Sequence, residues 1–335
     1  MQGFLFINGQ IRARESRLLT VGRLDRMIGA KTPEEAFRVL LELQYAEYVD
    51  ENASPKDFNP IIERGLQETK DLIITGTDGH LGLQFLWKSE DLNNLKRAYK
   101  LKFLENKEEL GEFTEENGFS TLGDFSHEDI QQIVFAEKTP EHVPALYAGV
   151  FKKVNEVFED KKEFRFVEFL LDQAHFDYLA QIAKKTGVAF LQNWLELRID
   201  MVNLRSLVRS LLMREETLSS DAFVTGGTIA WEEIAKVQTF GDFSDFVKHT
   251  RLTDVRSLLH ENDSDEDKLI KIERECDRIE NEFLHDAQSG EINSIQVPLA
   301  YFQRRMQNAR MLKFVMFAKF HGLSPEEILK TLKHF

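Results

Sequence analysis

The sequence predicts an all-α protein, and three observations support that prediction. Apolar residues recur at three- and four-residue steps over long segments, which is the period of one helix face. The 335 residues include only 7 Pro and 18 Gly, which favours long helices over a sandwich of short strands. No convincing run alternates apolar and polar residues, and the apolar stretch 72–74 is the best candidate for a short strand.

Several predicted helices have a clear start. Thr32-Pro33-Glu34-Glu35 places a capping hydroxyl before a proline and two acids, which suits the first turn of a helix. Similar starts occur at Ser126-His127-Glu128-Asp129, Thr139-Pro140-Glu141 and Ser324-Pro325-Glu326-Glu327. These four sites predict helices that begin at or just after residues 32, 126, 139 and 324.

Three long segments show the clearest helical periodicity. The segments 164–185, 195–213 and 299–319 each have one apolar stripe. The stripe of the first consists of Val167, Leu170, Leu171, Ala174, Tyr178 and Ile182. The acidic run 262–267 is predicted to be a solvated entry to a further helix.

A motif of two acids and one asparagine occurs three times. Its acids are five residues apart, and its asparagine follows the first acid by 31 residues, within a charged helical segment. The copies are Glu63, Glu68 and Asn94; Asp172, Asp177 and Asn203; and Asp277, Glu282 and Asn308. They begin 109 and 105 residues apart, a period far above that of a solenoid repeat. The motif therefore predicts three helical subdomains built on one plan.

The predicted subdomains are residues 1–112, 113–222 and 223–335. Their boundaries fall in the segments 108–125 and 217–230, where Gly and Ser lie among polar residues. Units of this length agree with the usual size of a domain. Three such units can form a socket or collar.

A cation follows each asparagine by two residues. The cations are Lys96, Arg205 and Arg310. Asparagine is a poor residue for a helix interior, because its amide competes for backbone hydrogen bonds, so its return at equivalent positions needs a reason. We interpret the asparagine and cation as structural groups that tie their helix to the acidic helix of the same copy. A buried amide or charge is tolerated only with a partner.

This interpretation makes specific pairings. In the second copy, Asp172 should lie near Asn203 or Arg205, and in the third, Asp277 should lie near Asn308 or Arg310. The resulting candidates for structural or interface roles are Glu63, Asn94, Lys96, Asp172, Asn203, Arg205, Asp277, Asn308 and Arg310.

A catalytic or metal site is the alternative from another class. Five residues on a helix turn by about 140°, so Asp172 and Asp177 face different directions, whereas acid–base catalysis needs carboxylates that converge. The run 263–267 resembles a calcium loop without its central glycine and closing glutamate. The chain has neither a phosphate loop nor a His-Glu-x-x-His motif. An all-helical metal-dependent enzyme using these acids is one rival, and an unrelated helical adaptor is another.

The charge of the chain excludes several classes of partner. With 43 Lys and Arg against 57 Asp and Glu, its formal charge is −14. Nucleic acid and anionic membrane surfaces both require clustered cations, so neither is an expected partner. The one cysteine, Cys276, excludes an internal disulfide and fits a reducing compartment. No stretch reaches the length of a membrane span, and the apolar opening 3–7 is too short for a signal sequence.

Several passages of the chain together carry a resemblance to a known family through their order and spacing. Two of them are Asp91-Leu-Asn-Asn94-Leu95-Lys96 and Asp200-Met-Val-Asn203-Leu204-Arg205. The others are 11–19, 40–45, 298–302, 308–310 and 318–323, and together the passages span nearly the whole chain. On these passages the chain resembles the C subunit of the prokaryotic V-type and A-type rotary ATPases, a relative of the eukaryotic d subunit. Two departures occur: the family usually has an acid where Arg305 stands and an aliphatic residue where Ala309 stands.

The resemblance implies three similar helical subdomains arranged as a funnel with pseudo-threefold symmetry. It implies a non-catalytic subunit without a cofactor, present in one copy per complex. Its partners would be the central-shaft subunits of the soluble ATPase head and the membrane ring of ion-carrying subunits. Its location would be cytoplasmic, peripheral on the inner face of the cell membrane. Rotation would pass through it during proton or sodium transport, or during ATP synthesis.

Overall fold

The structure is a computed structural model that describes residues 3–43, 45–50, 53–104, 119–213, 220–250, 253, 263–288 and 293–332. Within these ranges the secondary structure is entirely helical, without a strand. The prediction of an all-α protein is therefore confirmed. The candidate strand 72–74 lies inside the helix α4, Phe58–Gly76.

The chain divides into two compact units. One comprises Met1–Leu86 and Leu284–Phe335, and the other comprises Trp87–Phe283. The chain passes from one unit to the other within two long helices, α5 (Gln84–Leu104) and α13 (Asp265–Gln288). The division into three similar subdomains stays a prediction.

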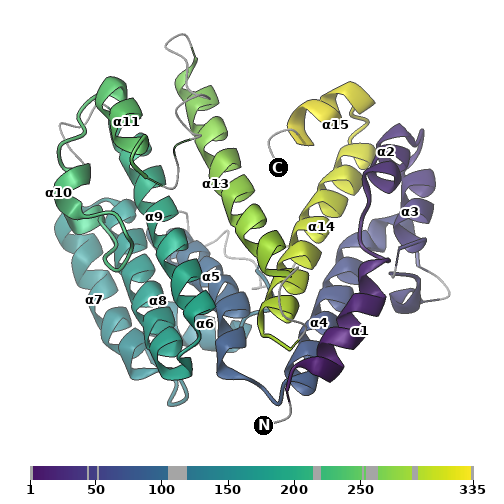
Figure 1. Ribbon diagram of the computed structural model, residues 1–335, viewed down its shortest axis with the longest axis horizontal. Coiled ribbons are helices and arrows are strands. Elements are labelled where there is room, and N and C mark those ends of the chain that lie inside the picture. Colours follow the sequence, from purple (N-terminus) through teal and green to yellow (C-terminus); the bar gives the residue numbers. More distant parts are fainter. Residues whose placement is uncertain are drawn as a thin grey trace. The chain divides into compact units, whose positions relative to one another are not determined.

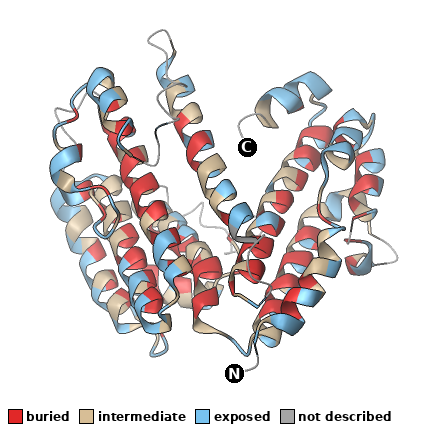
Figure 2. Cartoon of the chain, in the orientation of Figure 1, coloured by how far each residue is buried: buried red, intermediate tan, exposed pale blue. Residues whose placement is uncertain are grey.

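The first unit is built around α14, Gln296–Phe320. This helix packs against α1, α3 and α4, and Figure 1 shows it beside α1 and α4. Its buried positions recur along its length (Figure 2) and include Leu299, Phe302, Leu312, Val315 and Met316. The other helices of the unit are α1 (Leu5–Glu15), α2 (Val21–Gly29), α3 (Pro33–Leu41) and α15 (Pro325–Leu332). Short 3-10 turns occur at Tyr45–Tyr48, Pro55–Asp57 and Leu81–Leu83.

The second unit contains two hydrophobic clusters. In the first, α5 packs with α6 (His127–Val134), α7 (Ala145–Lys161) and α8 (Phe164–Thr186). In the second, α9 (Ala189–Leu212) packs with α10 (Trp231–Ile234), α11 (Phe240–Val247) and α13. A 3-10 turn lies at Ser220–Ala222. Because α8 also packs against α9, the two clusters adjoin within the unit.

Most of the predicted helix starts and long helices are confirmed. Thr32 and Ser126 accept hydrogen bonds from the first turns of α3 and α6, and Ser324 caps α15. The three periodic segments correspond to α8, α9 and α14. The start at Thr139 is wrong, because α7 begins at Ala145, directly after Pro144. A proline disfavours helical geometry in the residue before it, so the helix starts only beyond Pro144.

The acidic run leads into α13 as predicted. Ser264 Oγ accepts a hydrogen bond from the backbone N–H of Asp267 at 3.0 Å, and three acids occupy the first turn of the helix. Asn262 lies outside the described residues, as do 108–118 and 217–219 of the predicted boundaries.

Candidate functional site

The helix α5 is fastened to the segment after it by two polar side chains. Asn94 donates from Nδ2 to the carbonyl oxygen of Ser120 at 2.8 Å and accepts from its N–H at 2.9 Å. One turn earlier, Asp91 accepts from the backbone N–H of Phe125 at 2.8 Å. A Cβ on Gly123 would lie 2.2 Å from Asp91 Oδ1, so only glycine admits the carboxylate this close. We call the contacts of α5 with residues 119–134 and with α8 the first joint.

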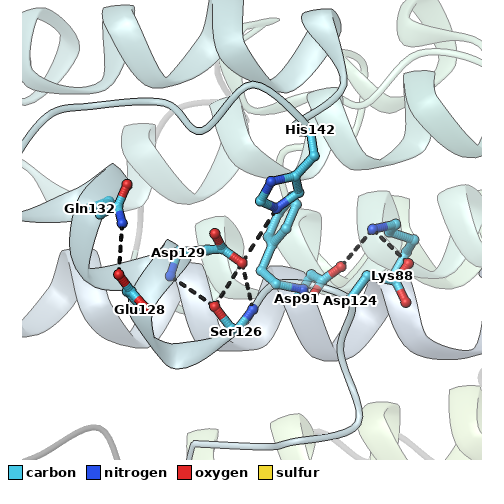
Figure 3. Close-up of polar contacts among 9 residues, drawn as sticks. Lys88, Asp91, Asp124, Ser126, Glu128, Asp129, Gln132 and His142 are labelled. Atoms are coloured by element: carbon cyan, nitrogen blue, oxygen red, sulfur yellow. Dashed lines mark hydrogen bonds and ion pairs between the residues drawn. The ribbon is translucent and has the colours of Figure 1, made fainter.

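A buried lysine adds a charge network to this joint. Lys88 is 3% exposed and lies 2.8 Å from carboxylate oxygens of both Asp91 and Asp124 (Figure 3). Burial alone would lower the pKa of Lys88, but the two carboxylates outweigh it and raise that pKa above its usual value. Its ammonium also lies 4.7 Å from the ring centre of Phe125. The lysine is therefore charged, and its ammonium contacts two carboxylates and one aromatic ring.

The start of α6 is fixed beside this network. Figure 3 shows Ser126 and Asp129 in a reciprocal capping box, in which each side chain accepts from the backbone N–H of the other. The ring of His142 lies 3.4 Å from the Asp129 carboxylate. Local sequence thus orients α6 directly after the segment that α5 holds.

An ion pair completes the first joint. Lys96 Nζ lies 2.6 Å from Asp172 Oδ1 on α8. Burial raises the pKa of Asp172, and the Lys96 ammonium opposes that rise. The pair connects the cation of the first copy of the motif with the acid of the second copy.

The helix α9 repeats the asparagine contact of α5. Asn203 donates to the carbonyl oxygen of Val224 and accepts from its N–H, both at 2.8 Å. Arg205, two residues later, pairs with Asp277 on α13 at 2.8 Å. We call the contacts of α9 with residues 220–238 and with α13 the second joint.

The carboxylate contact is repeated as well. Asp200 accepts from the N–H of Thr228 at 2.8 Å, from its hydroxyl at 2.6 Å and from the N–H of Ile229 at 3.1 Å. A Cβ on Gly227 would lie 2.2 Å from Asp200 Oδ1. Val224, Gly227 and Ile229 follow one another at the same intervals as Ser120, Gly123 and Phe125. The asparagine contact, the aspartate contact and the glycine beside it are therefore equivalent in the two joints.

The helix α14 holds two helices from the start of the chain. Lys313 forms an ion pair with Glu63 on α4. Lys319 donates to the carbonyl oxygen of Ile28 and, at 2.8 Å, to that of Ala30, where α2 ends. A cation at the carbonyl end of a helix satisfies groups without a partner inside the helix. We call the contacts of α14 with α2, with residues 45–48 and with α4 the third joint.

A buried arginine distinguishes the third joint. Arg305 stands three residues before Asn308, where Asp91 and Asp200 stand in the other joints. It is 1% exposed, donates to the carbonyl oxygen of Gly65 at 3.3 Å, and lies 5.1 Å from the ring centre of Tyr45. At this position the third joint therefore has a hydrogen-bond donor, Arg305, where the other two joints have a carboxylate that accepts.

The structure gives the candidate side chains different direct partners from those that the sequence hypothesis chose. The hypothesis paired each acid with its own copy. Instead, Asp172 contacts Lys96 of the preceding copy, and Asp277 contacts Arg205 of the preceding copy. Asn203 bonds the backbone of Val224. Asp172 and Arg205 still line one cavity of about 350 Å³, together with Lys96 and Asp277.

The pairing of Asp277 with Asn308 or Arg310 stays a prediction, and the described contacts of the third copy involve other cations. Arg310 is exposed on α14, and the cation that pairs with Glu63 is Lys313, one helical turn later. Asn308 is buried on α14. Sequence patterns did not identify Lys313 and Lys319, nor the contacts of Gly123 and Gly227 with the carboxylates of Asp91 and Asp200. The recurrence of Asp three residues before Asn in two copies was a visible signal for Asp91 and Asp200.

The second acids of the motif have no shared role. Glu68 accepts from the Tyr48 hydroxyl, Asp177 accepts from Gln173, and Glu282 pairs with Arg278. The acids proposed for a metal site also have separate partners, since Asp263 pairs with Lys271. Among the described residues, no three His, Cys, Asp or Glu side chains are grouped so that they could hold a metal ion. What the arrangement does chemically is to join helices through paired charges and amide contacts.

The chain is similar in sequence to subunits of known ATP synthases. In the described part of the chain, none of the helices combines the length and apolar character needed to cross a bilayer. The chain is 21% identical to the C subunit of the V-type ATP synthase of Deinococcus radiodurans, over 98% of this chain and 91% of that protein. It is 23% identical to the C subunit of the A-type ATP synthase of Thermococcus onnurineus, over 97% and 88%.

The family model covers all three joints. The model described as the ATP synthase (C/AC39) subunit matches residues 7–331. This match confirms the resemblance in the sequence and excludes an adaptor unrelated to rotary ATPases. The chain belongs to the ATP synthase (C/AC39) subunit family.

Proposed function

We propose that this protein is the non-catalytic central-stalk subunit of a V/A-type rotary ATPase. It links the rotary shaft of the soluble head to the membrane ring of ion-carrying subunits and transmits torque between them. The names of two relatives, which are C subunits of a V-type and an A-type ATP synthase, support the complex to which we assign it. The observation that carries the mechanical role is the recurrence of one polar joint between successive copies of the motif.

The physical requirement for such a role is stiffness. A coupling loses rotation if its parts slide under load, and packed helical interiors deform little. Apolar contacts alone resist sliding weakly, because they have no preferred direction. The joints add directional bonds: the amide of Asn203 holds both backbone groups of Val224, and Asp200 holds two successive N–H groups.

The same observations support three similar subdomains, 1–112, 113–222 and 223–335, related by pseudo-threefold symmetry. Matching intervals in two joints and an ion pair in all three are what copies of one ancestral bundle would retain. We infer a funnel of this kind, present once per complex, which binds the shaft on one face and the ring on the other. Its place is then cytoplasmic, peripheral on the inner face of the membrane.

The test is to remove and restore the subunit in the intact ATPase. Membrane vesicles from cells that lack it should retain ATP hydrolysis by the head and lose ATP-driven proton or sodium uptake. Adding back the wild-type chain should restore uptake, and a pull-down from solubilised membranes should recover shaft and ring subunits. Full ion uptake without the subunit would overturn the proposal. Uptake with either cation, measured separately, also identifies the transported ion.

A further inference from the structure

The helix α2 has the same relation to α14 that α6 has to α5. Thr20 caps α2 and Ser126 caps α6, 106 positions apart. The carbonyl oxygens of Ile28 and Val134 are also 106 positions apart, and each accepts from a lysine of the long helix: Lys319 in one case and Lys102 in the other. The third joint therefore resembles the first, with its lysine one helical turn farther along the long helix, although its two sides come from opposite ends of the sequence.

The ion pairs follow one cyclic order. The cation of the first copy, Lys96, pairs with the acid of the second, and the cation of the second pairs with the acid of the third. Lys313 of the third copy pairs with Glu63 of the first. Each copy thus holds the next, and the third holds the first.

The third joint differs from the others in how the chain connects its two sides. In the first joint, α5 and α6 are neighbours in sequence, and in the second, α9 and α10 are neighbours. In the third, α14 and α2 are joined only through the whole intervening chain. Its cohesion depends on packing and on the polar contacts of Lys313, Lys319 and Arg305. Under the same load, a joint whose two sides lack a short covalent connection deforms more than one whose sides are tethered, so we expect the third joint to yield first.

We propose that the third joint is the seam at which the three copies close, and that Lys313 with Glu63 are positioning residues that keep rotation coupled to ion transport. This inference rests on the proposed function. Lys313 is 30% and Glu63 12% accessible, so the ion pair is mostly shielded from solvent and its loss also lowers the stability of the chain. Transport is therefore compared per amount of subunit bound, and the position of the pair across the seam gives its loss an effect on the transmission of torque.

The test is a charge swap in the complete ATPase. The variants are Lys313→Glu, Glu63→Lys and the double swap, with Lys313→Met to remove the charge without reversing it. The matched control is Arg26→Glu, the same change of charge at an exposed pair with Glu42 that joins α2 to the residue ending α3. Ions transported per ATP hydrolysed are measured in vesicles and normalised to the amount of subunit bound.

The single swaps should lower the ions transported per ATP at least twofold, while ATP hydrolysis continues. The double swap should recover at least half of the loss, and Arg26→Glu should behave as wild type. A wild-type number of ions transported per ATP in both Lys313→Glu and Lys313→Met would overturn the proposal that the third joint is the seam. A double swap that recovers none of the loss would overturn it as well. Failure of the wild-type chain itself to restore transport would instead overturn the proposed function, so the two failures are distinguishable.

Discussion

The second and third joints place opposite charges at one position of equivalent helices. Asp200 and Arg305 each stand three residues before the asparagine of the motif, and they are 2% and 1% exposed. Asp200 faces a turn that presents two backbone N–H groups and a hydroxyl. Arg305 faces the carbonyl oxygen of Gly65 and the ring of Tyr45. The sign of a buried charge is thus set by the backbone groups opposite it.

The backbone groups opposite each side chain explain why an acid suits the second joint and a guanidinium suits the third. Successive N–H groups form a concave site that prefers an anion. A carbonyl oxygen inside a helix can accept donors in addition to the helical N–H, and that of Gly65 accepts from the Thr69 hydroxyl at 2.8 Å and from Arg305 at 3.3 Å. A Cβ on Gly65 would lie 2.8 Å from the Tyr45 ring, so glycine allows the close packing around Arg305. Asp200 and Arg305 are therefore each stabilised only by the backbone groups of their own joint.

Placing an acid at the position of Arg305 should have the greatest effect on stability. Arg305→Asp places a buried carboxylate against the Gly65 carbonyl oxygen, with repulsion in place of a bond. We expect it to lower the free energy of unfolding by about 3–5 kcal/mol, the usual cost of an uncompensated buried charge. Denaturant unfolding of Arg305→Asp beside Arg305→Met measures the effect. Stability equal to wild type in Arg305→Asp would contradict the requirement for a donor at this position of the third joint.

The next effect concerns the second joint. Asp200→Asn keeps the shape but turns an NH₂ group or a weaker acceptor toward the N–H groups of Thr228 and Ile229. We expect a loss of about 1–3 kcal/mol. Chemical denaturation should show the loss at neutral pH, with Asp221→Asn on an exposed side chain of the same unit as control. An unchanged midpoint would contradict the importance of the carboxylate contact.

A smaller, pH-dependent effect is expected beside the first joint. His175 on α8 is fully buried and lies 3.4 Å from the Tyr147 hydroxyl. Burial holds the pKa of His175 well below its usual 6.5, and the nearby cations Arg198, Lys96 and Lys88 lower it further. As the pH falls below about 6.5, the unfolded chain binds a proton that the folded protein does not. Stability should therefore decrease with acidification, by at most about 1.4 kcal/mol per pH unit for this group.

The measurement is the unfolding free energy between pH 7.5 and 5. His175→Gln should reduce the slope in this range, whereas His249→Gln, at an exposed position of the same unit, should leave it unchanged. Identical slopes in wild type and His175→Gln would exclude His175 as the source of acid sensitivity.

The smallest expected change is in thiol reactivity, and it compares the joints directly. Cys276 is buried beside Arg205 in the second joint, and burial raises its pKa to about 11. Only the thiolate reacts, so labelling of the native thiol should be about 100-fold slower than for an ordinary cysteine. Asp200→Asn should accelerate labelling, and Arg305→Asp should do so less. Equal acceleration in both variants would show that the joints open together.

The local features of this protein follow from residues that are close together in the sequence. Thr32, Ser126 and Ser324 cap helices because capping involves groups three residues apart. The long helices followed from their apolar periodicity, which is also local. The asparagines are interpreted as structural because an amide inside a helix needs a partner, and the backbone groups of Ser120 and Val224 are the partners of Asn94 and Asn203. Thr139 misled because Pro144, a few residues later, delays the helix.

Which polar groups meet depends on how the helices pack, and sequence patterns alone do not predict it. Lys313 contacts Glu63 across 250 residues, and Arg310, one turn away on the same helix, is exposed instead. Lys96 meets the acid of the next copy because the packing of α5 against its neighbours fixes which turn faces α8. The sequence sets the type of each polar side chain and its position along its helix. The rotation and register of packed helices, which depend on contacts along the whole chain, set its partner.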